Sequence, residues 1–266
     1  MNKKRASPRN NHSRTHGARP RFKDGTRIVV GRNAVREVLR HDPGRILELY
    51  VAPGNQERWL AKSELQRSIH QSAIHEVSKH EISKYSGTDS HQGVMAVVKE
   101  RARLPLKDLL KKELDLVLVL DAINDPQNLG ALLRAAECFA VDAVVLSPNR
   151  GCGITPIAAK SSVGASELLE IVEVSNLADA VRKLKEAGYW VIAADSGPSS
   201  QPLNEFEAPE RCVLMLGSEG EGLQPLLKKE ADMAVRIEME GVIDSLNVSQ
   251  ACAIFLHELR RQRKGS

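Results

Sequence analysis

Uninterrupted runs of apolar residues recur along the second half of the chain, and segments with helical spacing separate them. Runs of this kind are typical of strands buried on both faces of a sheet, and strands are expected at residues 116–120, 143–146, 170–174, 190–194, 212–216 and 233–237. Helices are expected at residues 129–140, 156–168, 177–187, 225–230 and 247–263. Thr155 is the expected N-cap of the second helix. This alternation predicts a parallel sheet with helices on both faces.

The first half of the chain carries a shorter α/β pattern. Strands are expected at residues 28–30, 46–51, 74–77 and 94–98. Helices are expected at residues 33–40, 57–70 and 80–85. Arg101, Arg103 and Pro105 then interrupt any regular pattern. The sequence therefore predicts a small α/β domain at residues 28–99, a linker at 100–113 and a larger α/β domain at 114–266.

The net charge of +4 is distributed unevenly along the chain. Residues 1–27 contain nine Lys or Arg and one Asp, and residues 260–266 contain four Lys or Arg and no acid, so the segment between them carries a net charge of −8. Residues 1–27 have few large apolar side chains to offset the entropy lost on ordering, and we expect a disordered basic tail. Such a tail fits nonspecific contact with a nucleic-acid backbone and a solubilising role about equally well.

Composition narrows the class of protein further. A hydrophobic content of 42% over 266 residues suits one large or two modest globular domains. No apolar run approaches the roughly 18 residues that span a membrane, and the basic N-terminus lacks the apolar core of a secretory signal. We therefore expect a soluble, cytoplasmic protein with no membrane partner. Cys138, Cys152, Cys212 and Cys252 form no C-x-x-C pair, and we expect reduced core thiols and no metal site.

The loop after the strand at residues 212–216 is the first candidate for chemistry. Gly217, Gly220 and Gly222 allow positive φ and the close approach of a ligand to the main chain. Two glutamates make the loop a poor cradle for phosphate, so it favours a cationic or neutral ligand. A solvent-exposed turn explains the loop, taken alone, about equally well. The spacing G-S-E-G-E-G does not match the dinucleotide-binding fingerprint, and no P-loop occurs in the chain.

Three short stretches carry a family resemblance. They read NDPQNLGALLR at residues 124–134, LMLGSEGEGL at 214–223 and IEMEGVIDSLNVS at 237–249. In this order and at these separations they closely resemble the motifs of the SpoU (TrmH) family of RNA ribose 2'-O-methyltransferases, in the SPOUT class. The matching positions are Asn128, Gly130 and Arg134, then Gly217, Ser218, Glu219, Gly220 and Gly222, then Met239, Gly241, Ser245, Leu246 and Asn247.

The resemblance implies a fold, a cofactor and an assembly. It implies that the larger domain has its C-terminal segment threaded into a deep trefoil knot. The smaller domain, with GRNAVREVL at residues 31–39 and HQGV at 91–94, resembles an RNA-binding domain similar to ribosomal protein L30e. The resemblance also implies a homodimer with the active site at the subunit boundary. S-adenosyl-L-methionine is then expected to bind at Leu216, Gly217, Ser218, Gly220, Ile237, Met239, Gly241, Ser245 and Leu246.

The same resemblance implies a set of catalytic residues, namely Asn128, Arg134, Glu219, Ser245 and Asn247. Methyl transfer to a ribose 2'-hydroxyl depends mainly on position and charge. A free arginine is a poor base, so we favour phosphate anchoring by Arg134 over proton removal, and a solvated surface cation is the alternative. Ser245 is not expected to be a covalent nucleophile, because no histidine lies in these motifs. Asn247 fits a helix N-cap equally well.

One position departs from the family pattern and leaves alternatives open. The third motif usually has proline where this chain has Glu238, which adds a backbone N–H, a negative charge and conformational freedom. The two-domain layout favours the branch that methylates guanosine 2'-hydroxyls in 23S rRNA. The alternatives are a tRNA 2'-O-methyltransferase and a noncatalytic RNA-binding or ribosome-assembly protein, which Glu238 supports. The intact set of Asn128, Arg134 and Glu219 favours an enzyme, because binding alone would not need it.

Overall fold

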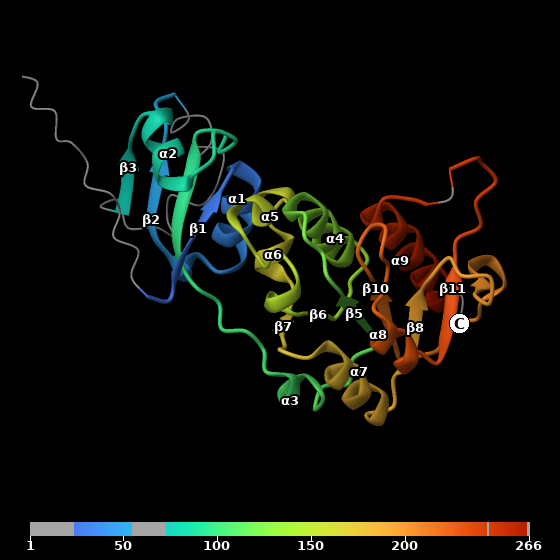
Figure 1. The fold of residues 1–266 in the computed structure, drawn as a ribbon. Coiled ribbons are helices and arrows are strands. Elements are labelled where there is room, and N and C mark those ends of the chain that lie inside the picture. Colours follow the sequence, from blue (N-terminus) through green and yellow to red (C-terminus); the bar gives the residue numbers. More distant parts are fainter. Residues whose placement is uncertain (1–23, 55–72, 244, 265–266) are drawn as a thin grey trace, which may run out of the picture.

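The computed structural model describes residues 24–54, 73–243 and 245–264. These residues form a sheet of four strands and a sheet of seven strands, each with helices on both faces. The two sheets lie side by side, and helices pack between them (Figure 1). No helix within the described ranges is long and apolar enough to cross a membrane.

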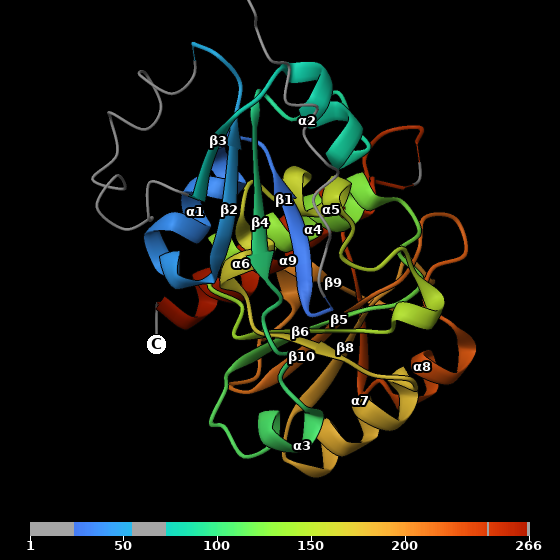
Figure 2. The same cartoon turned by 90° about the vertical axis from the view of Figure 1, so that its left-hand side faces the viewer.

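The smaller sheet has the strand order β1-β4-β2-β3. Its elements are β1 (Thr26–Val30), α1 (Arg32–His41), the 3-10 turn η1 (Pro43–Arg45), β2 (Ile46–Val51), β3 (Ile74–Glu76), α2 (Lys79–Ser86) and β4 (Val94–Lys99). Helices α1 and α2 cover opposite faces of this sheet, through Val35 and Val38 on one side and Ile82 on the other (Figure 2). The four expected strands and two expected helices are confirmed, although β1 begins inside the segment expected to be a tail. The expected helix at 57–70 lies outside the described residues.

The larger sheet has the strand order β7-β6-β5-β10-β8-β11-β9, and every pair in it is parallel. Its strands are β5 (Leu116–Leu120), β6 (Ala143–Leu146), β7 (Ile171–Glu173), β8 (Trp190–Ala194), β9 (Gln201–Pro202), β10 (Cys212–Leu216) and β11 (Met233–Arg236). The helical elements are α3 (Leu106–Leu109), α4 (Pro126–Cys138), η5 (Pro148–Arg150), α5 (Pro156–Ser161), α6 (Ala165–Leu168), α7 (Leu177–Glu186), η6 (Leu203–Glu205), α8 (Pro225–Glu230) and α9 (Val248–Lys264). The predicted parallel sheet is therefore confirmed, and the trefoil knot stays a prediction.

Alternate residues of each central strand face different helices. In β5, Leu116 and Leu118 pack on the side of α4 and α9, while Val117 and Val119 pack on the side of α7 and α8. Every residue of β5 and β10 is buried, which explains why both strands are apolar without interruption. The expected bounds agree to the residue for β5, β6, β8 and β10.

Helix α4 begins three residues earlier than the hydrophobic pattern predicts and ends at Cys138 instead of residue 140. Pro126 is its first residue, a position where the missing N–H of proline costs nothing. Asp125 caps the helix by accepting a hydrogen bond from the N–H of Gln127 at 2.9 Å. Asn128 therefore lies in the first turn of a helix, not in the loop before it.

The single helix expected at residues 156–168 is in fact two short helices, α5 and α6. Thr155 caps α5 as predicted, accepting a hydrogen bond from the N–H of Ala158 at 3.1 Å. The chain then turns at Val163 and Gly164, with φ angles of +56° and +102°. Gly164 is required there, because a Cβ would lie 2.7 Å from the side chain of Glu37 in α1. The segment 100–113, expected to be irregular, contains the helical turn α3.

The four cysteines are free thiols in different environments. Cys212 and Cys252 are fully buried, and burial raises the pKa of Cys212 to about 11 and that of Cys252 to about 12. Cys152 is half-buried. Cys138 is exposed at the end of α4, so the expectation of a core thiol is wrong there, because the apolar stretch around it turns this residue outward.

A buried carboxylate joins the two sheet units. The side chain of Glu167 in α6 is 1% exposed and pairs with Arg27 of β1 and with Arg45, whose Nη1 lies 3.2 Å from Oε2. Arg101, which follows β4, donates to the carbonyl oxygens of residues 167–169 at 3.2–3.4 Å. Three arginines from one unit thus surround the end of one short helix in the other. These contacts hold α6, and with it α5, against the smaller sheet.

Replacing Glu167 by alanine leaves two largely buried arginines without their acceptor. We expect Glu167→Ala to lower the free energy of unfolding by about 3–5 kcal/mol, as is usual when one side of a buried ion pair is removed. Denaturant unfolding followed by circular dichroism measures this. In the control Glu173→Ala, a partly exposed pair with Arg103 is lost, and about 1 kcal/mol or less is expected. An equal loss of unfolding free energy in the two variants would contradict the stabilising role of the buried Glu167 carboxylate.

Candidate active site

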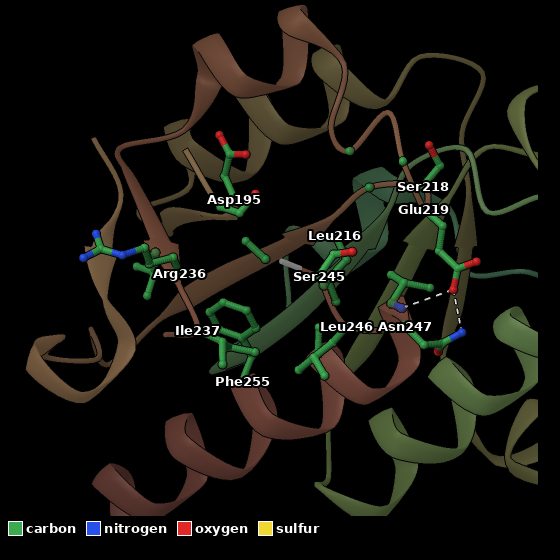
Figure 3. Close-up of a pocket in the computed structure, with 18 of the residues that line it drawn as sticks. Asp195, Leu216, Ser218, Glu219, Arg236, Ile237, Ser245, Leu246, Asn247 and Phe255 are labelled. Carbon is green, nitrogen blue, oxygen red and sulfur yellow. Dashed lines mark hydrogen bonds between the residues drawn. The ribbon is translucent and has the colours of Figure 1, made fainter. Parts of the chain in front are cut away.

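A cavity of about 820 Å³ opens at the carboxyl ends of β8, β10 and β11. This edge of an open parallel sheet is where ligands generally bind. Its walls come from the residues that follow each of these strands and from the start of α9 (Figure 3). Leu216, Leu246 and Phe255 supply apolar surface, while Asp195 and Ser218 supply polar groups. A cavity of this size and mixed character suits a small organic ligand such as a nucleoside derivative.

The loop after β10 folds back on itself, and its glycines serve that closure. The N–H of Gly222 donates to the carbonyl oxygen of Ser218 at 3.0 Å, and the two residues form a β-bridge. A Cβ at Gly217 would lie 2.1–2.2 Å from the backbone of Gly222 and Leu223. Gly220 and Gly222 have φ angles of +87° and +66°, where other residues are strained. The expected positive φ is confirmed at Gly220 and Gly222 but not at Gly217, where glycine is required because the chain itself fills the place of a side chain.

A buried aspartate fixes the far end of this loop. Asp121, which follows β5 and is fully buried, accepts hydrogen bonds from the backbone N–H of Gln224 at 3.1 Å and from its Nε2 at 2.7 Å. The N–H of Asp121 in turn donates to the carbonyl oxygen of Leu216 at 2.9 Å. The loop is therefore anchored to the neighbouring strand at both of its ends.

One carboxylate brings the three motifs together. Oε1 of Glu219 accepts hydrogen bonds from Asn128 Nδ2 at 3.1 Å, from Asn247 Nδ2 at 2.5 Å and from the N–H of Val248 at 3.4 Å. Asn247 Nδ2 also donates to Asn128 Oδ1 at 3.0 Å. Glu219 and Asn247 point toward each other at the edge of the cavity (Figure 3). The three N–H groups fix the orientation of the carboxylate through Oε1, and Oε2 makes no hydrogen bond to the described part of the chain.

Asn247 combines the two roles that its position allows. Its Oδ1 accepts hydrogen bonds from the N–H of Ser249 at 2.9 Å and from Ser249 Oγ at 2.6 Å, as an N-cap of α9 does. Its Nδ2 reaches Glu219 and Asn128. The cap fixes the plane of the amide, and the amide then orients the carboxylate.

A smaller hollow of about 220 Å³ adjoins the cavity. Asn128 and residues 122–125, which follow β5, line it, and it shares Ser218, Glu219 and Val248 with the cavity. Glu219 therefore borders both spaces. Two ligands that occupied the two spaces would meet beside this carboxylate.

Most residues that the sequence marks for cofactor binding line the cavity, namely Leu216, Gly217, Ser218, Gly220, Ile237, Met239, Ser245 and Leu246. Gly241 does not line it and is exposed in the following loop. Four of the residues marked as catalytic border the cavity or the hollow, namely Asn128, Glu219, Ser245 and Asn247. Arg134 borders neither space and is exposed on α4.

Several further lining residues were not predicted from the sequence, among them Asp195, Arg236 and Phe255. Asp195 follows β8 and Arg236 ends β11, and the rule that ligands bind at carboxyl ends of parallel strands could have found both. Lys228 Nζ holds the Asp195 carboxylate, at 3.0 Å from each oxygen. The guanidinium of Arg236 points away from the cavity (Figure 3). Phe255 gave no signal, because an apolar residue on α9 looks the same whether it lines a cavity or fills the core.

Glu238, which replaces the usual proline, lies outside the cavity lining. Its side chain is 52% exposed, and its Oε1 lies 3.7 Å from Nη2 of Arg236. Arg236 also donates to the carbonyl oxygen of Ser200. The added negative charge is therefore balanced at the rim and does not project into the cavity.

The fold and the site together define an α/β enzyme that binds an organic cofactor at the carboxyl edge of a parallel sheet, with a second binding space beside it. The chain belongs to the SpoU rRNA Methylase family, whose model matches residues 115–257. A second model, RNA 2'-O ribose methyltransferase substrate binding, matches residues 28–104. The two models cover the larger and the smaller sheet.

Curated relatives match along nearly their whole length. The chain is 35% identical over 242 residues to the 23S rRNA (guanosine-2'-O-)-methyltransferase RlmB of Vibrio cholerae, covering 89% of this chain and 97% of the relative. The protein of the same name from Shewanella oneidensis is 33% identical, with 89% and 98% covered. Among solved structures, the AdoMet-bound rRNA methyltransferase from Sinorhizobium meliloti superimposes with a TM-score of 0.71 at 26% identity, covering 89% of this chain and 87% of that one.

The two motif glycines Gly217 and Gly241 offer a matched test of the loop geometry. An added methyl group at Gly217 clashes with backbone that cannot move aside, whereas nothing lies within 4 Å of the corresponding position at Gly241. We expect Gly217→Ala to destabilise the protein by about 1–3 kcal/mol and Gly241→Ala by about 0.5 kcal/mol or less. Thermal unfolding of the two variants measures the difference. A wild-type Tm for Gly217→Ala would contradict the described loop.

Proposed function

We propose that this protein is an S-adenosylmethionine-dependent RNA ribose 2'-O-methyltransferase that acts on a guanosine of 23S rRNA. The observation that carries the proposal is the cluster of Asn128, Glu219 and Asn247, which borders both the cavity and the hollow. Its support in the comparisons is the match to named 23S rRNA (guanosine-2'-O-)-methyltransferases over both sheet units.

The cavity fits the cofactor. Backbone at Leu216, Ile237 and Leu246 can meet a flat base, and Asp195 and Ser218 offer oxygen atoms to ribose hydroxyls or to an ammonium group. When bound, S-adenosylmethionine supplies a methyl group activated by a positively charged sulfonium. Glu219, at the border of the cavity, favours a cationic ligand over an anionic one.

The smaller hollow is the proposed place of the target ribose. Asn128 and Glu219 border it, and the hydrogen bond between them, together with those from Asn247 to both, fixes their orientation before RNA arrives. A pre-oriented carboxylate beside a 2'-hydroxyl can hold that hydroxyl for in-line attack and favour loss of its proton. The chain's contribution to the reaction is therefore mainly positioning, with charge stabilisation at one carboxylate.

Arg134 is the proposed phosphate anchor, and its location depends on the assembly. It lies six residues after Asn128, so it projects from a different side of α4, and it is exposed. In the proposed homodimer, with the active site at the subunit boundary, an exposed arginine on α4 is available to RNA held at that boundary. The smaller domain at residues 28–99 and the basic tails are proposed as further RNA contacts, and a cytoplasmic location belongs to the same proposal.

Glu238 no longer favours a noncatalytic protein. Its carboxylate pairs with Arg236 and lies outside the cavity lining, so the substitution leaves the cofactor space open. A tRNA substrate is the remaining alternative, and the match of the substrate-binding model to residues 28–104 and of the whole chain to the 23S rRNA enzymes speaks for rRNA.

Transfer of labelled methyl groups tests the proposed function. We expect label from S-adenosylmethionine on unmodified 23S rRNA and not on bulk tRNA. Arg134→Ala should lower the rate at least about ten-fold, because a charge-assisted hydrogen bond to phosphate is lost. The control Arg182→Ala, on the opposite face of the sheet, should keep the wild-type rate. Label on tRNA alone would shift the substrate class, and no label on either RNA would overturn the proposal.

Calorimetry of the pure protein with S-adenosylmethionine tests the role of Glu238 separately. We expect measurable binding, and a Kd for Glu238→Ala within about three-fold of the wild-type Kd, because an exposed ion pair contributes at most about 1 kcal/mol. Undetectable binding by the wild-type protein, together with binding by Glu238→Pro, would instead mean that Glu238 disables the site.

A further inference from the structure

Arg150 lies against the segment that lines the smaller hollow. It ends η5, and the next residues pack onto the chain after β5. The N–H of Cys152 donates to the carbonyl oxygen of Ile123 at 3.0 Å, and a Cβ at Gly151 would lie 2.8 Å from that same oxygen. Because Ala122 and Ile123 line the hollow, residues 151–152 lie behind that part of its lining, and Arg150 directly precedes them.

The guanidinium of Arg150 is held at one end and open at the other. Its Nε lies 3.8 Å from Oδ1 of the fully buried Asp121, while the side chain of Arg150 is 49% exposed. Asp121 already accepts two hydrogen bonds from Gln224, so its position does not depend on the arginine. Nη1 and Nη2 of Arg150 make no hydrogen bond to the described residues, and they remain available to a ligand.

The hollow itself lacks a positive charge. Its lining contains two carboxylates, of Asp125 and Glu219, and no Lys or Arg. Asp125 is engaged as the N-cap of α4, and Glu219 accepts three hydrogen bonds from the protein. A nucleotide in this space carries a phosphodiester on each side of its ribose, and a bordering cation is needed to offset that charge.

We propose that Arg150 binds a phosphodiester of the RNA next to the target ribose, and that Asp121 orients its guanidinium for this contact. The inference rests on the proposed function, because it assumes that the hollow takes the target nucleotide. Arginine suits the task, since its planar fork can meet two phosphate oxygens at once, and a lysine cannot. Arg150 then fixes the nucleotide within one protomer, and this contact is separate from that of Arg134.

The test compares Arg150→Gln with the wild-type protein, with Arg150→Lys and with the matched control Arg182→Gln. Arg182 is similarly exposed, on α7, and pairs with Glu230 at 2.9 Å. We expect Arg150→Gln to raise the KM for unmodified 23S rRNA about ten-fold, with partial recovery in Arg150→Lys. The Kd for S-adenosylmethionine and the Tm should stay at the wild-type values. Filter binding of the same RNA should show a salt slope that is smaller by about 0.7–0.9, as for one lost phosphate contact.

Several outcomes would overturn the inference. One is an RNA affinity of Arg150→Gln equal to that of Arg182→Gln. Another is a parallel loss of cofactor affinity and Tm, which would make Arg150 only a structural partner of Asp121. Filter binding keeps this test separate from the proposed function. If the wild-type protein binds RNA without transferring methyl groups, weaker binding by Arg150→Gln still supports the phosphate contact while the proposed activity fails.

Discussion

The site depends on the hydrogen bonds made to a single carboxylate, that of Glu219. Three N–H groups from α4, from the loop before α9 and from the start of α9 converge on one of its oxygens. Glu219 is itself exposed, so these hydrogen bonds act by fixing the relative positions of the three segments and the orientation of the carboxylate. The cavity and the hollow lie on either side of this contact, which therefore helps to set the geometry of both.

A second carboxylate, that of Glu167, also joins separate segments, and here the segments belong to the two sheet units. It is paired with Arg27 and Arg45 of the smaller unit, and it belongs to the α5–α6 segment that packs beneath α4. Gly130 allows α4 and α5 to approach so closely that a Cβ would lie 2.3 Å from Ser161. The smaller sheet, α5 and α4 therefore form one packed series that ends at Asn128, and this series fixes the position of the smaller unit relative to the site.

The parts that the sequence predicted are those decided by local burial. Strands β5 and β10 were predictable to the residue because both faces are covered, which forces every position to be apolar. The start of α4 was missed because Pro126 looks like a break, although proline is favoured in the first turn. The pairing of Arg27 with Glu167 spans 140 residues and leaves no local pattern. The motifs identified most of the cavity lining through family resemblance. They could not show why position 217 must be glycine, because that requirement comes from a contact between two backbone segments.

A crystal structure of the protein with S-adenosylmethionine would show directly where the cofactor lies relative to Glu219. We predict electron density for the cofactor in the cavity at the carboxyl ends of β8, β10 and β11, with its methyl group directed to the side of Glu219 that borders the hollow. Cofactor density elsewhere on the protein, or a methyl group directed away from Glu219, would contradict the proposed roles of the cavity and the hollow.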